Sequence, residues 1–217
     1  MLRDAIYYPQ RGPGWLWTLV TGSLLVLVGT VTFVPLIPVQ GYLLRVLRST
    51  AEERPNPPKF TDWGDLFVDG ARSIAVQVAY LFVPVLLVLF GVVAPAVAPP
   101  AVGTALLVLG GFALVAVLYF LPGALTRLAT TDSLAAAFDI RAVAAAARRP
   151  IYVVAVVEAY VALFVVAGLG GVLVLILIGS VFAFYGQVVG YHLFARGYAG
   201  ATGDGQDPYG SVGTAAE

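Results

Sequence analysis

Long apolar runs with almost no charged residues dominate this sequence, and they decide what kind of structure it can form. Each run is roughly 20 residues long, and an α-helix of that length spans a hydrocarbon core of about 30 Å. Hydrophobic residues make up 60% of the 217-residue chain and charged residues only 11%, whereas a soluble domain has about a quarter charged. We therefore expect an all-α, polytopic integral membrane protein. The runs cover residues 16–39, 74–94, 101–121, 151–167 and 172–191.

The number of membrane helices depends on how the first apolar run is interpreted. If residues 29–32 (Gly-Thr-Val-Thr) form a turn, the run folds into two short helices, and the chain has about six membrane helices in three hairpins. If the run crosses once, the chain has five spans and an outside N-terminus. The uncharged segments 94–100 and 168–171 are the other expected turns. Similar inward ends, V-Q-G-Y-L-L-R, L-P-G-A-L-T-R and V-V-G-Y-H-L-F-A-R, form a weak repeat that favours the hairpins.

Positive charge is unevenly distributed between the two ends of these hairpins. Residues 41–73 carry five Lys and Arg residues and residues 123–150 carry four, whereas 94–101 and 168–171 carry none. Because positively charged loops stay on the cytoplasmic side, we expect both charged segments and the C-terminus in the cytoplasm, in a protein of the cell (plasma) membrane. The formal net charge is zero, so no overall field favours a nucleic-acid partner.

The domain organisation is simple. One transmembrane helical domain is expected over residues 1–198, followed by a disordered polar tail over 199–217 that is rich in Gly, Asp, Gln and Ser. Cytoplasmic interfacial helices are predicted near 60–70 and 133–147. The first of these helices has two different faces. Its aromatic face is formed by Phe60, Trp63, Leu66, Phe67 and Gly70, and its polar face by Asp62, Asp65 and Asp69.

Two adjacent motifs carry a resemblance to a known family. They are Gly41-Tyr42-Leu43-x-Arg45-x-x-Arg48 and Pro58-x-Phe60-x-Asp62-Trp63-x-x-Leu66-Phe67-x-x-Gly70. Together they resemble a family of archaeal and bacterial multi-pass membrane proteins catalogued as a domain of unknown function, number four thousand and thirteen. The resemblance extends to about Arg196 and implies an integral membrane protein without an established activity, so it supplies no functional residues. The use of eleven Arg to one Lys suits a GC-rich, archaeal-like genome.

Glu158 is the sharpest single candidate for chemistry, because it stands alone inside the apolar run 151–167. Carboxylates at such positions usually face a bundle interior or a water-filled cavity. One interpretation is a proton or cation site in a small carrier or channel. The other is a hydrogen-bonded glutamate that holds helices together. The candidate partners are Gln77, Gln187, Tyr160 and Arg127.

A juxtamembrane cluster in residues 45–72 is the candidate site for lipid head groups. Basic side chains near a membrane surface attract anionic lipids by about 1 kcal/mol per charge, although the same charges can serve topology alone. The candidates are Arg45, Arg48, Lys59, Trp63 and Arg72.

Two further patterns have simpler explanations. The aspartates at 62, 65 and 69 share a helical face and could hold Mg²⁺ or Ca²⁺. A solvated polar face with Asp69 near Arg72 is favoured instead. Gly186 and Gly190 are spaced for close helix packing, within the chain or in a dimer.

The functional expectation is correspondingly limited. The chain has no Cys and one His, His192, and no nucleophile, zinc or nucleotide motif, so we expect no enzyme, no catalytic residues, no metal and no cofactor. The favoured function is a non-enzymatic membrane component that binds lipid, a membrane-protein partner or a second copy. The alternative is a small carrier or channel around Glu158, and a lipid-modifying enzyme using the aspartates is a weaker third option.

Overall fold

The computed structural model describes residues 2–170 and 177–203, and every regular element in these ranges is a helix. The all-α prediction is therefore confirmed for the described residues. In chain order the elements are α1 (Leu2–Tyr7), η1 (Tyr8–Gln10), α2 (Trp15–Thr32), α3 (Leu36–Ala51), α4 (Trp63–Val93), η2 (Ala94–Ala96), α5 (Pro100–Thr131), α6 (Leu134–Ala137), α7 (Ile140–Ala147), α8 (Pro150–Gly170) and α9 (Leu177–Thr202).

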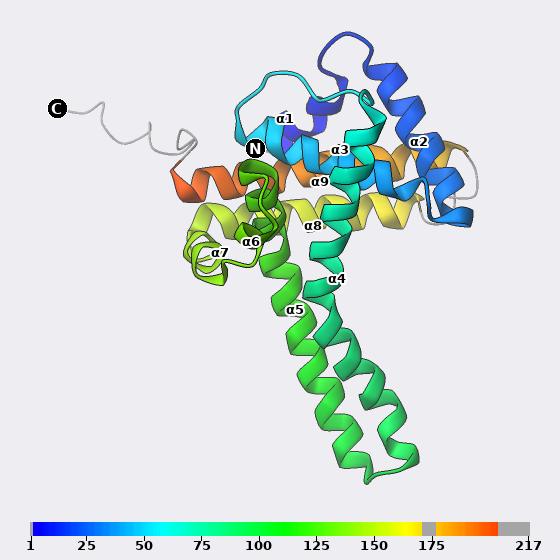
Figure 1. The fold of residues 1–217 in the computed structure, drawn as a ribbon, viewed down its shortest axis with the longest axis vertical. Coiled ribbons are helices and arrows are strands. Elements are labelled where there is room, and N and C mark those ends of the chain that lie inside the picture. The colour runs from blue at the N-terminus through cyan, green and yellow to red at the C-terminus, as the bar shows by residue number, and fades with distance from the viewer. Residues whose placement is uncertain (1, 171–176, 204–217) are drawn as a thin grey trace, which may run out of the picture.

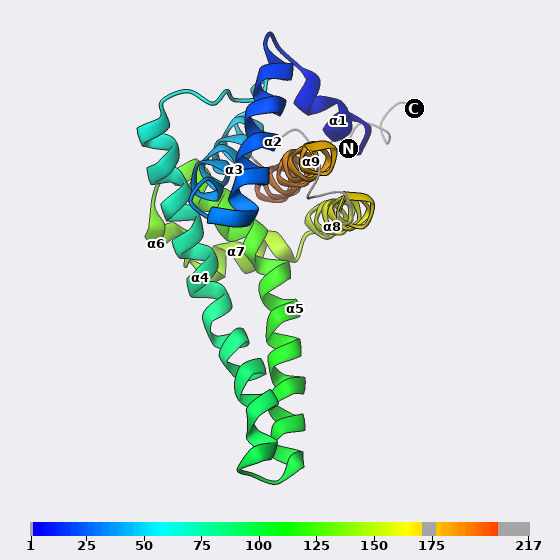
Figure 2. The same cartoon turned by 90° about the vertical axis from the view of Figure 1, so that its right-hand side faces the viewer.

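The two longest helices, α4 and α5, form a hairpin that projects away from the other helices (Figures 1 and 2). They have 31 and 32 residues, and no charged residue occurs between Arg72 and Arg127. The arms touch through glycines: a Cβ on Gly103 would lie 2.8 Å from the carbonyl oxygen of Gly91. Contact through small residues is typical of helices that pack within lipid. The hairpin therefore has the composition and the packing of a membrane segment.

The remaining helices pack around one end of this hairpin, with α9 at their centre. α9 contacts α1, α2, α3, α5, α7 and α8, and its buried side chains join both parts of the apolar core. α8 and α9 lie across the hairpin. Figure 2 shows α8 and α9 end on and α4 and α5 along their length. The outward side of α8 is apolar, with Val157, Val161 and Phe164 exposed.

Three helices in the described residues are long and apolar enough to cross a membrane. They lie at Trp15–Thr32, Trp63–Ala96 and Pro100–Thr131, and a shorter apolar segment occupies Pro150–Val165. These helices indicate a membrane protein. The finer expectation of six spans in three hairpins, and its five-span alternative, stay predictions.

The first apolar run contains two helices, and its break lies later than the predicted turn. α2 continues through residues 29–32, and the chain turns at Phe33–Pro35. Phe33, which has a positive φ of 58°, ends α2, and Pro35 precedes α3. Within this helical segment the Thr30 and Thr32 hydroxyls donate to the carbonyls of Leu27 and Val28 in the preceding turn.

Four other predicted boundaries differ in the structure. The helix predicted near 60–70 is not a separate element but the start of α4, and its Leu66, Asp69 and Gly70 are buried against α3. The helix near 133–147 divides into α6 and α7, since Asp139 caps α7 by accepting from the Ala142 amide. α9 continues to Thr202, so the predicted tail is helical at 199–202, and its residues 204–217 lie outside the described part. The predicted turn at 168–171 begins within α8, and 171–176 also lie outside.

Pro122 interrupts the hydrogen bonding of α5, and a tyrosine of α8 fills the gap. In a continuous helix the Leu118 carbonyl would accept from the amide of residue 122, but proline has no N–H. The carbonyl accepts instead from the Tyr160 hydroxyl, at 2.7 Å. The break in α5 therefore becomes an attachment point for α8.

A second tyrosine of α8 bridges the next helical pair. The Tyr152 hydroxyl donates to the Tyr119 carbonyl at 2.8 Å and accepts from the Gly123 amide at 3.1 Å, so it stands between two groups that would bond directly in a regular helix. The Tyr119 hydroxyl donates in turn to the Ala147 carbonyl of α7. The base of the hairpin is thus fastened to α7 and α8 by tyrosines.

Replacing Tyr160 with Phe should lower the free energy of unfolding by about 1–3 kcal/mol, because the Leu118 carbonyl loses its donor in apolar surroundings. In a Pro122→Ala background the amide of residue 122 can donate to Leu118, and the same Tyr160→Phe change should cost much less. Unfolding of the four proteins in detergent micelles gives the coupling energy. An equal cost in both backgrounds would show that Tyr160 contributes by packing alone.

Candidate functional site

Helices α3 and α4 cross in backbone contact at two glycines, and this crossing positions the candidate site. A Cβ on Gly41 would lie 2.0 Å from the Leu66 carbonyl oxygen, and a Cβ on Gly70 would lie 2.0 Å from the Ile37 carbonyl oxygen. Any larger side chain at either position would push the helices apart. The crossing brings the polar C-terminal half of α3 against the first turns of α4.

Arg45 fastens this crossing with all three of its guanidinium nitrogens. Nε lies 3.3 Å from Asp69 Oδ2 in an ion pair, Nη1 donates to the Thr61 carbonyl at 2.8 Å, and Nη2 donates to the Asp62 carbonyl at 3.4 Å. The two charged side chains are only 17% and 11% exposed. Truncating one member of a buried pair typically costs about 3–5 kcal/mol, because the other charge stays buried. Arg45 is therefore a structural residue of the site.

Asp132 joins the end of α5 to both crossing helices. It ends α5 in the left-handed region, with φ 54°, a conformation that Asp tolerates better than most residues. Its Oδ1 lies 2.9 Å from Arg72 Nη1 and 3.4 Å from Arg48 Nη2. Arg48 also donates through Nε to the Ala129 carbonyl at 2.6 Å. Three helices therefore meet in one charged cluster.

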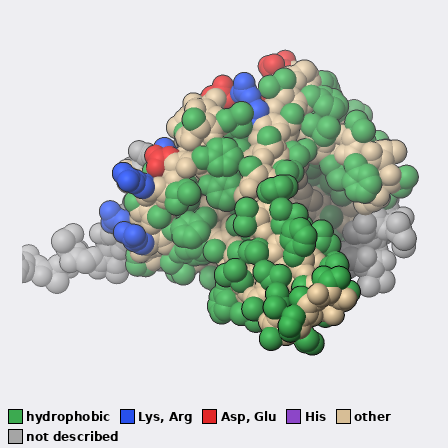
Figure 3. Space-filling view, turned by 60° about the horizontal axis from the view of Figure 1, so that its bottom comes forward, with side chains coloured by type: hydrophobic (Ala, Val, Ile, Leu, Met, Phe, Trp, Pro, Cys, Tyr) green, Lys and Arg blue, Asp and Glu red, His purple; other side chains and the backbone are tan. Residues whose placement is uncertain are grey.

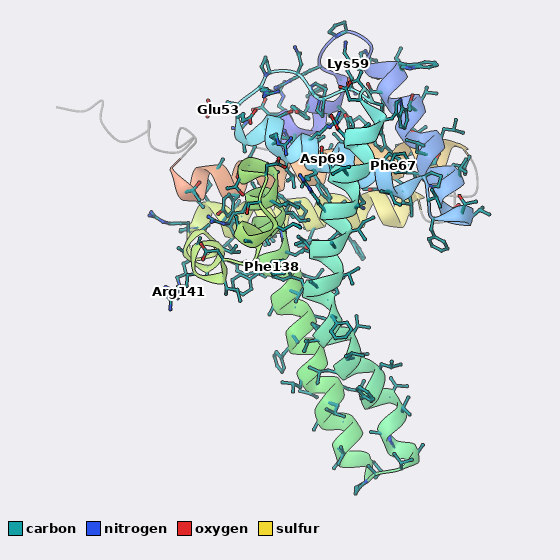
Figure 4. All side chains as sticks on the ribbon, in the orientation of Figure 1. Glu53, Lys59, Phe67, Asp69, Phe138 and Arg141 are labelled. Carbon is teal, nitrogen blue, oxygen red and sulfur yellow. The ribbon has the colours of Figure 1, made fainter. Side chains whose placement is uncertain are left out.

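Helices α3 and α4, the loop between them and the end of α5 line an open polar pocket of about 560 Å³. Figure 4 shows Lys59 and Asp69 on the part of the molecule away from the hairpin tip. Five basic and three acidic side chains line the pocket, so positive charge is in excess. We call it the arginine pocket, and its charged residues are Arg45, Arg48, Arg54, Lys59, Asp65, Asp69, Arg72 and Asp132.

Some of the basic groups in the arginine pocket remain free to bind an anion. Lys59 is exposed and forms no ion pair with any residue that the structure describes. Arg72 meets Asp132 through one nitrogen, Nη1. Guanidinium and ammonium groups both donate to phosphate oxygens, guanidinium in a bidentate fork. The arrangement can therefore hold a phosphate-bearing group.

The structure brings together four of the five residues predicted to contact lipid head groups. Arg45, Arg48, Lys59 and Arg72 line the arginine pocket, whereas Trp63 does not. Trp63 is 44% exposed and its ring lies 6.0 Å from that of Phe60. The expected aromatic face is divided because the helix packs on α3 through part of that face.

Asp69 and Arg72 both line the arginine pocket, but each forms its ion pair with another residue. Asp69 is buried and pairs with Arg45 on α3, while Arg72 pairs with Asp132. The three aspartates at 62, 65 and 69 do not act as one set, because the third is turned toward α3. Within the described ranges no group of three His, Asp or Glu residues is placed to hold a metal ion.

Glu158 lines a separate, apolar groove of about 370 Å³ between α8 and α9. The candidate partners do not gather around it. Gln77 donates to Gln40 Oε1 and to Ser73 Oγ, both at 3.1 Å. Two others are engaged elsewhere, Tyr160 with Leu118 and Arg127 with Asp139, and Gln187 is not among the groove residues. None of these four side chains lines the groove beside Glu158.

The remaining candidates pack within the chain. A Cβ on Gly190 would lie 3.0 Å from Leu163 Cγ on α8, and Gly186 borders the Glu158 groove. His192 is buried with its ring centroid 4.0 Å from that of Tyr8, and its Nδ1 shares a 2.9 Å hydrogen bond with Thr50 Oγ1. Burial, with smaller effects of Arg196 and Arg11, lowers the pKa of His192 to about 3.

Sequence reasoning missed Asp132 as a member of the site. It lies 60 positions from Arg72 along the chain, and no local spacing connects the two residues. The available signal was its place directly after a long helix, followed by Ser133, where a capping residue is common. That signal predicts a helix boundary but does not say which helices meet there.

Gly41→Ala and Gly70→Ala should each lower the free energy of unfolding by at least about 2 kcal/mol, because the new methyl group meets a backbone carbonyl that cannot move alone. Thermal unfolding in detergent measures the effect. Gly64→Ala is the matched control, since no atom lies within 4 Å of its added Cβ. Gly64 lies in the first turn of α4, and Ala there should be neutral or stabilising. Similar effects at all three positions would rule out the close crossing.

Comparison with known proteins identifies a family and nothing more specific. The model of a protein of unknown function, DUF4013, matches residues 24–187, a range that includes both crossing helices, the whole hairpin and Glu158. No curated protein and no solved structure matches the chain. The resemblance carried by the two motifs is thereby confirmed, and the chain belongs to the DUF4013 family of proteins of unknown function.

Proposed function

We propose that this protein is a non-enzymatic integral membrane protein whose arginine pocket binds the phosphate-bearing head group of an anionic lipid. The observation that carries the proposal is the excess of basic side chains around a 560 Å³ opening at the base of an apolar hairpin. The volume lies within the range of about 300–1,000 Å³ that small-molecule sites occupy.

The position of the arginine pocket relative to the hairpin supports a lipid as the ligand. Arg72 lies in the pocket and Val93 ends α4, and the helix between them is about 31 Å long at 1.5 Å per residue. This length equals the thickness of a hydrocarbon core. If the hairpin tip lies at one membrane surface, the pocket lies at the other, among lipid head groups.

The surface agrees with this placement. Figure 3 shows the molecule with the hairpin end brought toward the viewer: hydrophobic side chains cover that face, and charged side chains appear only along its upper and left margin. The connection between α4 and α5 contains Pro95 and Pro99, and Pro100 begins α5. Prolines have no N–H to leave unpaired. The tip therefore presents few unsatisfied donors to lipid.

The charge distribution gives the proposed orientation. The segments that carry Arg45 to Arg72 and Arg127 to Arg149 are basic, and the hairpin turn is uncharged. By the positive-inside rule the arginine pocket faces the cytoplasm and the turn faces outside. The exposed apolar flanks of the hairpin suit acyl chains and a membrane-protein partner alike, and the pocket is what favours lipid.

Lys59→Gln combined with Arg72→Gln should weaken binding of dihexanoyl phosphatidylglycerol about 30-fold, at about 1 kcal/mol per charge. Calorimetric titration of protein in phosphatidylcholine nanodiscs measures the affinity. The loss should shrink at high salt, because the pocket is open to water.

The matched control removes two charges outside the arginine pocket. Arg148 and Arg149 are exposed and form no ion pair with the described residues, so Arg148→Gln with Arg149→Gln should leave the affinity nearly unchanged. Equal losses in both double variants would reduce the interaction to general surface charge. Tight binding of glycerol phosphate alone would assign the pocket to a soluble phosphate ester instead, and equal binding of dihexanoyl phosphatidylcholine would exclude anion selectivity.

The proposed topology can be tested with single cysteines, because the chain has none of its own. Val97 at the hairpin tip is 88% exposed, and Glu53 is exposed near the arginine pocket. An impermeant maleimide added to intact cells should label Val97→Cys but not Glu53→Cys, and permeabilised cells should show both. Labelling of Glu53→Cys in intact cells would show that the orientation is the opposite of the one proposed. A Val97→Cys protein that stays unlabelled in both would place the tip inside the bilayer.

A further inference from the structure

A second, smaller pocket of about 170 Å³ adjoins the arginine pocket. Residues between 11 and 18, in the segment before α2 and in its first turn, line one side of it, and residues 56–59 line the other. Lys59 and Pro58 line both pockets, so the two openings are neighbours. We call the smaller one the N-terminal pocket. A ligand with two anionic groups can therefore reach both pockets at once.

The side chains that line the N-terminal pocket give it a positive charge. Arg11 and Lys59 are among them, and none of the lining residues is Asp or Glu. Arg11 meets Asp4 through one nitrogen, Nη2, at 3.4 Å, and both side chains are exposed. An exposed pair of this kind gains little, so it does not prevent Arg11 from binding another anion. Arg11 and Lys59 both offer donors that suit phosphate oxygens.

The backbone around the N-terminal pocket is restricted before any ligand binds. Gly12 has a φ of +88°, and a Cβ there would lie 3.2 Å from Asn56 Oδ1. The two sides of the pocket thus come together at a position that favours glycine. Pro13, Pro57 and Pro58 restrict φ in both segments. A site that is already restricted loses less conformational entropy when it binds.

The N-terminal pocket lies on the side of the arginine pocket that faces away from the hairpin. Figures 1 and 2 show the connection before α2 at the end of the molecule opposite the hairpin tip. Figure 4 shows Lys59 farther from that tip than Asp69, which lines the arginine pocket. If the hairpin crosses the membrane, the N-terminal pocket is the more distant of the two from the hydrocarbon core. An anion held there belongs to the outer end of a lipid head group.

We propose that the ligand of the arginine pocket is a lipid whose head group carries a second, terminal phosphate, and that the N-terminal pocket binds this phosphate. The assignment rests on the proposed function, because the arginine pocket holds the phosphate that joins the head group to the rest of the lipid. A terminal phosphate carries a charge of about −1.5 to −2 at pH 7, and it lies beside Arg11 and Lys59. Lys59, which lines both pockets, lies between the two phosphates.

The experiment compares dioctanoyl phosphatidylinositol 4-phosphate with dioctanoyl phosphatidylinositol, which lacks the terminal phosphate. Each lipid is titrated calorimetrically into the full-length protein in phosphatidylcholine nanodiscs, and the heat of titration into empty nanodiscs is subtracted. The phosphorylated lipid should bind about tenfold more tightly, because its second phosphate is attracted by two nearby cations. Equal affinities would overturn the second site and leave the proposed function standing. Failure of both lipids to bind would overturn both.

Arg11→Gln should remove most of the preference for the phosphorylated lipid. Binding of phosphatidylinositol should stay nearly unchanged, because Arg11 lines the N-terminal pocket and not the arginine pocket. The matched control is Arg3→Gln, at an exposed arginine of the same N-terminal segment that lines neither pocket, and it should alter neither affinity. Equal losses in the two variants would reduce the preference to general surface charge and contradict the site.

Two further variants separate binding by Arg11 from its contact with Asp4. Asp4→Asn removes the ion pair and keeps Arg11, so the preference should persist, and its loss would show that Arg11 acts only through the N-terminal segment. Asn56→Asp adds a negative charge to an exposed side chain of the N-terminal pocket with almost no change in shape. It should reduce the preference about as much as Arg11→Gln, and an unchanged preference would exclude a phosphate from this pocket.

A last measurement establishes whether the two phosphates belong to a lipid. Inositol 1,4-bisphosphate carries both phosphates and no acyl chains, and it should bind at least about tenfold more weakly than phosphatidylinositol 4-phosphate, because acyl chains gain contact with the exposed apolar flanks of the hairpin. Equal affinities would assign both pockets to a soluble bisphosphate and overturn the lipid as the ligand.

Discussion

The contact of two helix backbones at Gly41 and Gly70 is the constraint on which the polar half of the structure depends. Each glycine faces a carbonyl of the other helix, at Leu66 and Ile37, so the contact fixes both the distance and the register of α3 and α4. Only in that register does Arg45, one turn beyond Gly41, meet Asp69. The arginine pocket therefore depends on the two glycines, which have no side chain, as much as on the charged residues that line it.

The apolar half follows a different rule, because lipid offers no hydrogen bonds to a broken helix. Pro122 leaves the Leu118 carbonyl without its helical donor, and Tyr160 supplies one. The repair also fixes a direction: α8 has to lie across α5 at the level of the proline. The crosswise arrangement of the hairpin and the α8–α9 pair is thus connected to Pro122, which has no N–H to donate.

Local pattern predicted much of the chain, and it failed where partners come from distant segments. The uncharged runs predicted the α4–α5 hairpin, and the basic cluster predicted four of the residues that line the arginine pocket. Spacing along one helix suggested Arg72 as the neighbour of Asp69, but an i, i+3 pair on a surface gains little. Burial against Arg45 across the glycine contact decides the pairing. The same limit applies to Glu158. The sequence shows that it lies in an apolar run, but not which residues of other helices surround it.

The charges of the arginine pocket divide into those that hold the helices and those that can hold a ligand. Arg45 has every nitrogen engaged within the chain, and its pair with Asp69 is largely removed from water. A buried pair of this kind gives little net stability, yet it is very sensitive to the loss of one member. Loss of lipid binding after substitution of Arg45 would therefore report on the α3–α4 crossing rather than on recognition. Lys59, exposed at the mouth of the pocket, can recognise a head group without being needed for the fold.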